Sequence, residues 1–415
     1  MKSKNLLVAA MLFVLTTAKM SAADLCVAEN GTGGCYSTIT DAINAAANGD
    51  RIIINPKAGN APYAENLTIT KTLQFLCNVE GSQYAVSGNI TITPAANRVI
   101  VFIGMNNLTG NLTVTGNSPA GARCKISVMN CNFGNGTVSL DFDNLDVTVA
   151  SCVFSNGSIA FRYGKAIGND VTTISNPSYG VGQTGSIVVN NDATATNDSV
   201  LIVGNKIILT SGVYPTGIIF NSSNQYFYIS NNVVTAPASL YCGIGTYSAK
   251  NTNLGRNTIL NNTIAPSTTI SYGIMVTTVT NSLHDIINNL IVATGGSNGV
   301  YITGGGPVQT SYNYMSNPLT LYGIIDDGTN NLSSNTTLDA NYRPNSGTDA
   351  INGGSPDEAY YDINLTRNDA GAFGGSFTQD NFYPVTGAAR VYLVRAPRKI
   401  TLGSTLNVKG DSFDR

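Results

Sequence analysis

The chain of 415 residues is poor in charged side chains and has a single histidine. Asp, Glu, Lys and Arg make up only 11% of the residues, and the formal net charge at pH 7 is -2. A protein that binds nucleic acid needs a surplus of basic side chains, so the composition argues against that class. One histidine, with no two cysteines spaced as a CxxC pair, also argues against a zinc site.

Long hydrophobic stretches are missing as well, apart from one near the start. Lys2 and Lys4 precede an uncharged and mostly apolar run over 6–18, and small residues follow at 21–23. This order is typical of a secretory signal peptide, so we expect residues 1–23 to be removed and the product to be extracellular or on the cell surface. No later run approaches the roughly 20 apolar residues of a membrane helix, so no transmembrane segment is expected.

The abundant residues favour β-structure. The chain has 43 glycines and 20 tyrosines, together with many asparagines, threonines and serines. Low charge combined with strong β-formers argues against disorder and predicts a surface of neutral hydrogen-bonding groups. A solenoid can hold several hundred residues without dividing into domains.

A short phrase recurs in the first half of the chain, at intervals typical of one β-helical turn. Each copy enters from Asn or Gly and then alternates apolar residues with Thr or Ser, which would place one set inside a coil and the other in solvent. The copies are Asn66–Ile69, Asn89–Ile92, Asn111–Val114, Gly136–Ser139 and Gly157–Ala160.

A different phrase, containing Asn between apolar residues, recurs in the second half, and a Gly marker keeps step with it. Asn tolerates the left-handed turn conformation, and stacked Asn amides can hydrogen-bond between turns. Gly is expected to permit the other sharp corner. The Asn phrases are Val203–Ile207, Ile229–Val233, Leu260–Ile264 and Ile287–Ile291, and the markers are Gly217, Gly243, Gly273 and Gly299.

The open end of such a coil needs a cover, and the sequence before the first repeat predicts one. Thr38–Asp41 is a helix-start pattern. Ile39, Ala42, Ile43 and Ala46 then fall on one helical face before Gly49. We therefore expect a short amphipathic helix, followed by a strand over 51–54.

These segments resemble the pectin-lyase-like right-handed parallel β-helix superfamily. The likeness lies in 36–43, 49–54 and 63–69 at the start, and in 361–364, 367–369 and 371–375 at the end, which is similar to the closing segment of many secreted bacterial members. It spans roughly residues 34–376. The resemblance implies an all-β right-handed solenoid with an N-terminal capping helix. It implies no single function, because the superfamily includes lyases, hydrolases and adhesins.

Three parts are expected: the signal peptide over 1–23, the β-helix with its cap and closing loop over 24–376, and a tail over 377–415. Within the second part, 347–369 is rich in Gly, Asn and Asp and is predicted to be a capping loop. In the tail, 390–395 and 400–408 alternate like two strands. They indicate either a small hairpin or the start of a further β-module.

The seven cysteines fall into different settings. Cys26 and Cys35 flank a Gly-rich segment and could form a small disulfide in an oxidising compartment. Cys131 and Cys152 occur in related phrases one turn apart. We expect these two to stack in the core.

One group of charged residues comes together if the turns stack in register. Aligning 138–143 with 159–164 places Asp141 beside Arg162, with Asp143 and Lys165 close by. Lyases of the resembled superfamily often place calcium-binding carboxylates beside an Arg or Lys base. Asp141, Asp143, Arg162 and Lys165 are therefore the candidate catalytic residues of a polysaccharide lyase or glycoside hydrolase. The alternative is a salt bridge on a stacked surface.

Other candidates are less specific. Asp362, Asn364, Thr366 and Asp369 carry oxygen ligands at nearly alternate positions, as a calcium loop would, or as a turn that hydrogen-bonds its own backbone would. His284, beside Asp285, is either a general acid or a turn residue. Stacked Thr rows could order water as in ice-binding solenoids, and tyrosines could stack on sugars. The rows are Thr68, Thr70, Thr91, Thr93, Thr113 and Thr115, and the tyrosines include Tyr226, Tyr228, Tyr247, Tyr272 and Tyr301.

The leading hypothesis is a secreted or cell-surface β-helix that binds or adheres to carbohydrate, such as a polysaccharide or a cell-surface glycan, through its neutral Asn, Thr and Tyr surface. The alternatives are a polysaccharide lyase or glycoside hydrolase and, in third place, an ice-binding protein. Whether the chain is an enzyme stays open at this point. The repeat is clear, and catalytic residues are sparse.

Overall fold

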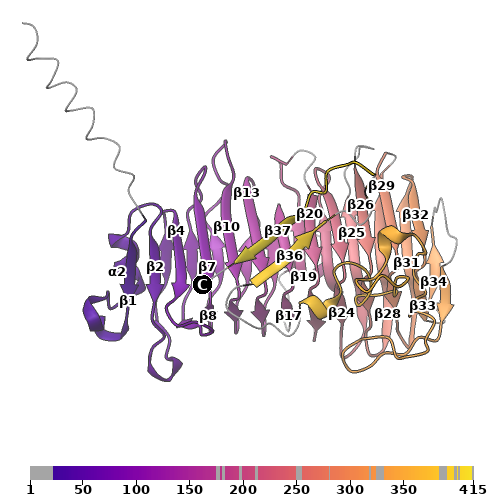
Figure 1. Ribbon diagram of the computed structural model, residues 1–415, viewed down its shortest axis with the longest axis horizontal. Coiled ribbons are helices and arrows are strands. Elements are labelled where there is room, and N and C mark those ends of the chain that lie inside the picture. The colour runs from indigo at the N-terminus through magenta and orange to yellow at the C-terminus, as the bar shows by residue number, and fades with distance from the viewer. Residues whose placement is uncertain are drawn as a thin grey trace, which may run out of the picture.

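The computed structural model describes residues 22–173, 178–179, 183–195, 199–210, 214–248, 255–279, 281–316, 319–323, 331–382, 390–396, 400 and 402–413. The expected signal peptide therefore lies almost wholly outside the described residues. Short strands stack turn upon turn into three long parallel sheets, here named A, B and C (Figure 1). The fold class is confirmed as an all-β, right-handed parallel β-helix with a short N-terminal capping helix.

From β4 onward each turn of the coil visits sheets A, B and C in that order. Sheet A contains β1 (Asp24–Val27), β2 (Arg51–Ile54), β4 (Leu73–Cys77), β7 (Val99–Ile103), β10 (Cys124–Met129), β13 (Leu145–Ala150), β16 (Gly164–Ile167), β20 (Ser199–Val203), β23 (Tyr226–Ser230), β26 (Arg256–Leu260), β29 (Leu283–Ile287) and β32 (Val308–Ser311). Sheet B contains β5 (Tyr84–Val86), β8 (Met105–Asn107), β11 (Asn132–Phe133), β14 (Val153–Phe154), β17 (Asp170–Thr173), β21 (Lys206–Leu209), β24 (Val233–Thr235), β27 (Thr263–Ile264), β30 (Leu290–Ile291), β33 (Tyr314–Ser316) and β35 (Leu332–Ser334). Sheet C contains β3 (Leu67–Ile69), β6 (Ile90–Ile92), β9 (Leu112–Val114), β12 (Val138–Leu140), β15 (Ile159–Phe161), β19 (Gln183–Asn190), β22 (Pro215–Asn221), β25 (Leu240–Ser248), β28 (Thr269–Thr278), β31 (Gly295–Gly304) and β34 (Thr320–Tyr322), with β18 (Ser178–Tyr179) antiparallel to β19.

The N-terminal end is covered as the sequence predicts. Helix α2 (Ile39–Ala45) buries its apolar face on the coil, and the Thr38 hydroxyl accepts the backbone N–H of Asp41 at 3.0 Å. Cys26 and Cys35 form a disulfide around the 3₁₀ segment η2 (Glu29–Gly34). The other 3₁₀ segments are η3 (Ala58–Asn60), η4 (Glu358–Tyr360) and η5 (Gln379–Asn381). Among the described residues, no helix has the length and apolar character needed to cross a membrane.

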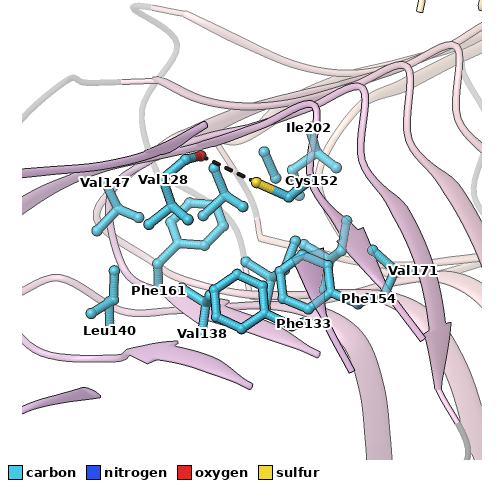
Figure 2. Close-up of a cluster of buried hydrophobic side chains, with 14 of the residues drawn as sticks. Val128, Phe133, Val138, Leu140, Val147, Cys152, Phe154, Phe161, Val171 and Ile202 are labelled. Carbon is cyan, nitrogen blue, oxygen red and sulfur yellow. Dashed lines mark hydrogen bonds between the residues drawn. The ribbon is translucent and has the colours of Figure 1, made fainter. Parts of the chain in front are cut away.

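The first-half phrases are consecutive strands of sheet C, paired in register. Thr68 pairs with Thr91 and Thr91 with Thr113, while the apolar residues on either side point inward and are buried. Inside the coil, like side chains meet like, as in the stacked rings of Phe133 and Phe154, whose centroids are 4.9 Å apart (Figure 2). Stacking of this kind buries apolar faces that one turn alone leaves exposed.

An asparagine row runs along the corner between sheets A and B. In each turn from Gly168 to Tyr312 the first corner residue has a positive φ, as at Asn231 (55°) and Asn261 (53°), and the second is an Asn of the row. From Asn205 onward, the Oδ1 of each Asn accepts the backbone N–H and the Nδ2–H of the Asn one turn earlier, with distances of 2.8 to 3.2 Å. The Oδ1 of Asn169 accepts the backbone N–H of Cys152 at 3.0 Å. The row consists of Asn169, Asn205, Asn232, Asn262, Asn289, Asn313 and Asn331.

Each of these side chains also satisfies backbone carbonyls. The Nδ2 of Asn262 donates to the carbonyl of Ile229 at 3.0 Å and to that of Leu260 at 3.2 Å. The backbone N–H of Asn232 in turn bonds to a side-chain oxygen, Oδ1 of Asn262, at 3.0 Å, and leaving such a buried group unpaired would be costly. The predicted stacking of Asn amides is therefore confirmed. The Asn side chains supply hydrogen bonds to backbone groups at this corner.

Cysteines take the Asn position in the two turns before the row. The thiol of Cys152 lies 3.4 Å from the carbonyl of Val128, as Figure 2 shows, and 3.3 Å from that of Ala150. These carbonyls correspond in position to the two that Asn262 reaches. Cys131 and Cys152 are both buried, as predicted, and burial raises the pKa of the Cys152 thiol well above its usual value.

The Gly markers do not form a corner, so that prediction is wrong. Gly217, Gly243, Gly273 and Gly299 lie inside long strands of sheet C, and none has a positive φ. A Cβ on Gly273 would come within 2.4 Å of the carbonyl oxygen of Gly299 and 2.8 Å of Ile291 Cδ1, in sheet B. Glycine is required there because sheets B and C approach too closely for a side chain.

After the last turn, residues 335–382, which we name the return segment, run back along the corner between sheets A and B (Figure 1). Gly371 donates its N–H to the carbonyl of Asn288 at 2.8 Å. Farther along, Gln379 donates to the carbonyls of Asn205 and Asn231 at 3.3 and 2.6 Å. The stretch expected to be a capping loop, 347–369, thus belongs to a segment that follows the side of the coil.

The tail forms a hairpin on the outer face of sheet A. Strands β36 (Arg390–Arg395) and β37 (Lys409–Phe413) are antiparallel and lie across the coil in Figure 1. Tyr392 and Leu393 pack on apolar residues of sheet A. The predicted first strand matches β36. The second was placed at 400–408, whereas β37 begins at Lys409, the partner of Arg395 at the end of β36.

The asparagine row gives a test of corner stability. We expect Asn262→Ala to lower the free energy of unfolding by about 2 to 4 kcal/mol, because buried donors and acceptors in two turns lose their partners. Asn78→Ala is the control, since that exposed side chain makes one amide contact, to Asn55; it should cost less than about 0.5 kcal/mol. Equal losses in denaturant titrations would contradict the role of the row.

Candidate functional site

Three of the four predicted catalytic residues meet at the corner between sheets C and A. Asp141 and Asp143 lie between β12 and β13, and Arg162 lies one turn later. Arg162 Nε is 3.0 Å from Asp141 Oδ1, and Arg162 Nη1 is 2.8 Å from Asp143 Oδ1. Lys165 does not join them, because it lies on sheet A with its Nζ 2.9 Å from Asp411 Oδ2 in the hairpin.

Both carboxylates of this cluster accept a further hydrogen bond. Asn190 Nδ2 donates to Asp141 Oδ2 at 2.8 Å, and the backbone N–H of Ala193 donates to Asp143 Oδ1 at 2.9 Å. The Arg162 side chain is 26% exposed. Partial burial opposes its charge, yet the hydrogen bonds to Asp143 and Asp141 raise the pKa of Arg162. A guanidinium held in this way is a poor base, since a base must first lose a proton.

The Arg162 cluster leads to a stability prediction. We expect Arg162→Ala to cost about 1 to 3 kcal/mol, because two partly buried carboxylates lose their shared partner. Arg51→Ala serves as the matched control: its partner Asp24 is 49% exposed, and such surface pairs contribute less than about 1 kcal/mol. Chemical unfolding of both variants would show whether the cluster holds the corner together. A smaller loss for Arg162→Ala than for Arg51→Ala would refute this.

The predicted calcium ligands bind the backbone of their own loop. Asp362 accepts the N–H of Gly375 at 2.6 Å and that of Asp369 at 3.1 Å. Asn364 Oδ1 accepts both the N–H and the hydroxyl of Thr366, and Asp369 Oδ1 accepts the N–H of Asn352 at 2.6 Å. Burial raises the pKa of Asp362 to about 6 despite the bond from Gly375. These N–H donors point to where a cation would have to bind, so the arrangement does not fit calcium at Asp362.

His284 lies inside the coil rather than at a turn or on the surface. It belongs to β29, its exposed fraction is 1%, and its ring centroid is 6.0 Å from that of Phe227. Within the described residues neither ring nitrogen has a hydrogen-bond partner. Burial lowers the pKa of His284 to about 4. A side chain at this depth cannot reach a substrate in solvent.

The buried histidine predicts a pH effect on stability. The folded-state pKa lies below the usual value near 6.5, so the unfolded chain binds the proton more tightly and folding weakens as pH falls from 6.5 towards 4. We expect the free energy of unfolding of the wild type to drop by about 2 kcal/mol more between pH 7 and 5 than that of His284→Gln or His284→Met. Identical pH slopes in wild type and both variants would refute the assignment.

Five tyrosines form a row across the exposed face of sheet C. Their ring centroids follow one another at 5.1, 5.5, 4.9 and 5.0 Å, and the terminal rings, Tyr214 and Tyr322, are each 58% exposed. The rings of Tyr301 and Tyr322 are nearly parallel, and the earlier pairs meet edge to face or tilted. The row consists of Tyr214, Tyr241, Tyr272, Tyr301 and Tyr322.

The described strands of sheet C at the tyrosine row are uncharged. Strands β22, β25, β28, β31 and β34 contain no Asp, Glu, Lys or Arg. Their outer positions carry neutral groups instead, such as Ser271, Asn298 and Thr320. Partial burial raises the pKa of Tyr241, with its neighbour Tyr272 adding to the effect, so the phenol stays neutral. Rings and neutral hydrogen-bonding groups thus share one uncharged surface.

The sequence points to only part of this row. Tyr272 and Tyr301 were predicted as sugar platforms and belong to it, whereas Tyr226 is buried and Tyr228 packs under Phe377 of the return segment. Tyr214, Tyr241 and Tyr322 were missed. The row crosses the strands diagonally: its tyrosine stands two residues before Gly243 in β25 but two after Gly299 in β31. No constant spacing from the Gly marker could have revealed it.

The threonine rows lie on the same sheet nearer the N-terminus. Thr68, Thr91 and Thr113 are in register and at least partly exposed. The column then continues through Ser139 to Ala160, which is buried. The regular threonine surface is therefore three turns long, as the sequence indicates.

Comparison with known proteins provides no relative. No family model matches the chain, and neither a curated protein nor a solved structure matches it. The parallel β-helix is therefore established by the stacked sheets themselves. Its function must be argued from the surfaces described above.

Proposed function

We propose that the protein is an exported β-helix that binds neutral carbohydrate along the tyrosine row of sheet C. The observation that carries this proposal is the succession of five neighbouring rings, one in each of five turns. Four of them stand on strands of sheet C without a charged residue, and Tyr214 directly precedes such a strand, β22. Aromatic rings offer apolar faces to the C–H groups of sugars, and phenol, amide and hydroxyl groups bind their hydroxyls. An uncharged surface favours neutral over acidic polysaccharides.

Export is supported by two features near the N-terminus. Residues 1–23 have the pattern of a signal peptide. Just after them, Cys26 and Cys35 form a disulfide, a bond that persists mainly in oxidising compartments. The pectin-lyase-like resemblance is in keeping with a secreted protein of this kind, and we propose the extracellular space or the cell surface as its location.

Binding is favoured over catalysis by the state of the charged residues. A lyase needs a base free to take a proton, and a hydrolase needs a carboxyl group free to act on the scissile bond. In the Arg162 cluster the guanidinium is bonded to Asp141 and Asp143, which accept further hydrogen bonds. Lys165 is bonded to the hairpin. The cluster therefore serves better as a corner support than as an active site.

The tyrosine row can be tested by retention on immobilised glycans. We expect the wild type to bind at least one neutral polysaccharide among amylose, laminarin and galactomannan. Tyr272→Ala and Tyr301→Ala should each weaken that binding by about tenfold, which corresponds to about 1.4 kcal/mol. Tyr36→Ala, a change of an exposed tyrosine at the N-terminal end, should leave it unchanged.

The same experiment can refute the proposal. Polygalacturonate is the acidic comparison, and product analysis for unsaturated and reducing ends covers the enzyme alternative. Retention by polygalacturonate alone, or no retention by any of the glycans, would contradict neutral carbohydrate binding. Release of product that is lost in Arg162→Ala and kept in Tyr272→Ala would replace it with the enzyme alternative.

A further inference from the structure

A pocket lies between sheet B and the return segment, away from the tyrosine row of sheet C. It has a volume of about 450 Å³, and its walls include Asp170 and Lys206 from the sheet and Arg343, Phe373, Gln379 and Asp380 from the return segment. Small-molecule sites usually fall between about 300 and 1,000 Å³ and combine apolar walls with a few polar groups. This pocket has that size and composition.

Two unengaged charged groups stand side by side in the sheet wall of this pocket. Asp170 and Lys206 are register partners on β17 and β21, so their backbones are about 4.8 Å apart. Among the described residues, no hydrogen bond reaches the Asp170 carboxylate, and Lys206 acts on it through its charge alone. Burial raises the pKa of Asp170, and Lys206 opposes this only in part.

On the opposite wall, Arg343, Asp380 and Gln379 already have partners within the protein. Arg343 is paired with Asp380, and its guanidinium lies 4.2 Å from the ring centroid of Phe373. Gln379 is buried and donates both of its described side-chain hydrogen bonds to carbonyls at the corner between sheets A and B. The pocket as a whole balances two carboxylates against two cations. It therefore favours a ligand without net charge.

We infer that this pocket binds a neutral mono- or disaccharide through a pair of neighbouring hydroxyl groups. One hydroxyl donates to the Asp170 carboxylate, and the adjacent one accepts from the Lys206 ammonium. Because a hydroxyl both donates and accepts, a vicinal diol satisfies a carboxylate and an ammonium one turn apart at once. The site does not rest on the tyrosine row, which lies on sheet C.

Isothermal titration calorimetry on the full chain tests the inference. The probes are glucose, galactose, mannose, rhamnose, cellobiose, maltose and lactose, with glycine and glutamate as zwitterionic and acidic comparisons. We expect at least one of the sugars to bind. Asp170→Asn and Lys206→Met should each weaken that binding by about tenfold or more, because each removes a charge-assisted hydrogen bond.

Two controls separate this site from the proposed function. Asp24→Asn removes a carboxylate from an exposed ion pair at the N-terminal end and should leave sugar binding unchanged. Tyr272→Ala should also leave it unchanged, even though that variant tests the tyrosine row. Melting temperatures show whether each variant folds. If Asp170→Asn does not fold, Lys206→Met alone tests the site.

Three outcomes would overturn the inference. The first is that none of the seven sugars binds to the wild type. The second is that a sugar binds but Asp170→Asn and Lys206→Met retain its affinity within twofold. The third is that only glycine or glutamate binds in a way that depends on Asp170 and Lys206, which would identify the pocket as a site for amino acids.

Discussion

Every turn of this coil has to lie on the turn before it in the same register, because one turn alone cannot bury its apolar face. A slip by one residue in any strand would exchange the inward and outward side chains. The corner between sheets A and B holds the register in the second half, since each Asn of the row is bonded to the equivalent Asn of the neighbouring turn. The sheets, the stacked rings and the surface rows all follow from that repetition.

The sequence predicts well the features that are local or repeated. The first-half phrases became sheet C strands because alternation alone determines which side chains are buried, and α2 begins at the Thr38 cap because capping is a matter of four residues. The pairing of Asp141 with Arg162 was also foreseen, since stacked phrases make neighbours of aligned residues.

Contacts between segments far apart in the sequence cannot be predicted from local or repeated patterns. Lys165 was grouped with Arg162 by closeness in sequence, but its partner Asp411 comes from the hairpin, 246 residues away. The pocket at Asp170 is not predictable from the repeats, because most of its lining residues belong to the return segment. The Gly markers were recognised but misinterpreted. A repeated Gly is found both where two sheets leave no room for a side chain and where the backbone needs a positive φ, and the sequence does not distinguish the two.

The return segment and the hairpin divide the outside of the coil between them. The hairpin packs on sheet A, and the return segment covers the corner beside it, where Phe382 lies over Gly168 and Gly204. Sheet C keeps an uncharged face with its five rings. The polar chemistry is thus separated in space: ion pairs support corners and the hairpin, and neutral groups are left to face solvent on sheet C.

The tyrosine row has one ring for each turn, so its length is a count of turns. Duplication of a single repeat in the gene would add one Asn to the corner and one ring to the face, without disturbing the turns on either side. A binding surface built in this way can grow or shrink in whole units. The number of repeats in the gene would then set the length of extended ligand that the surface can contact.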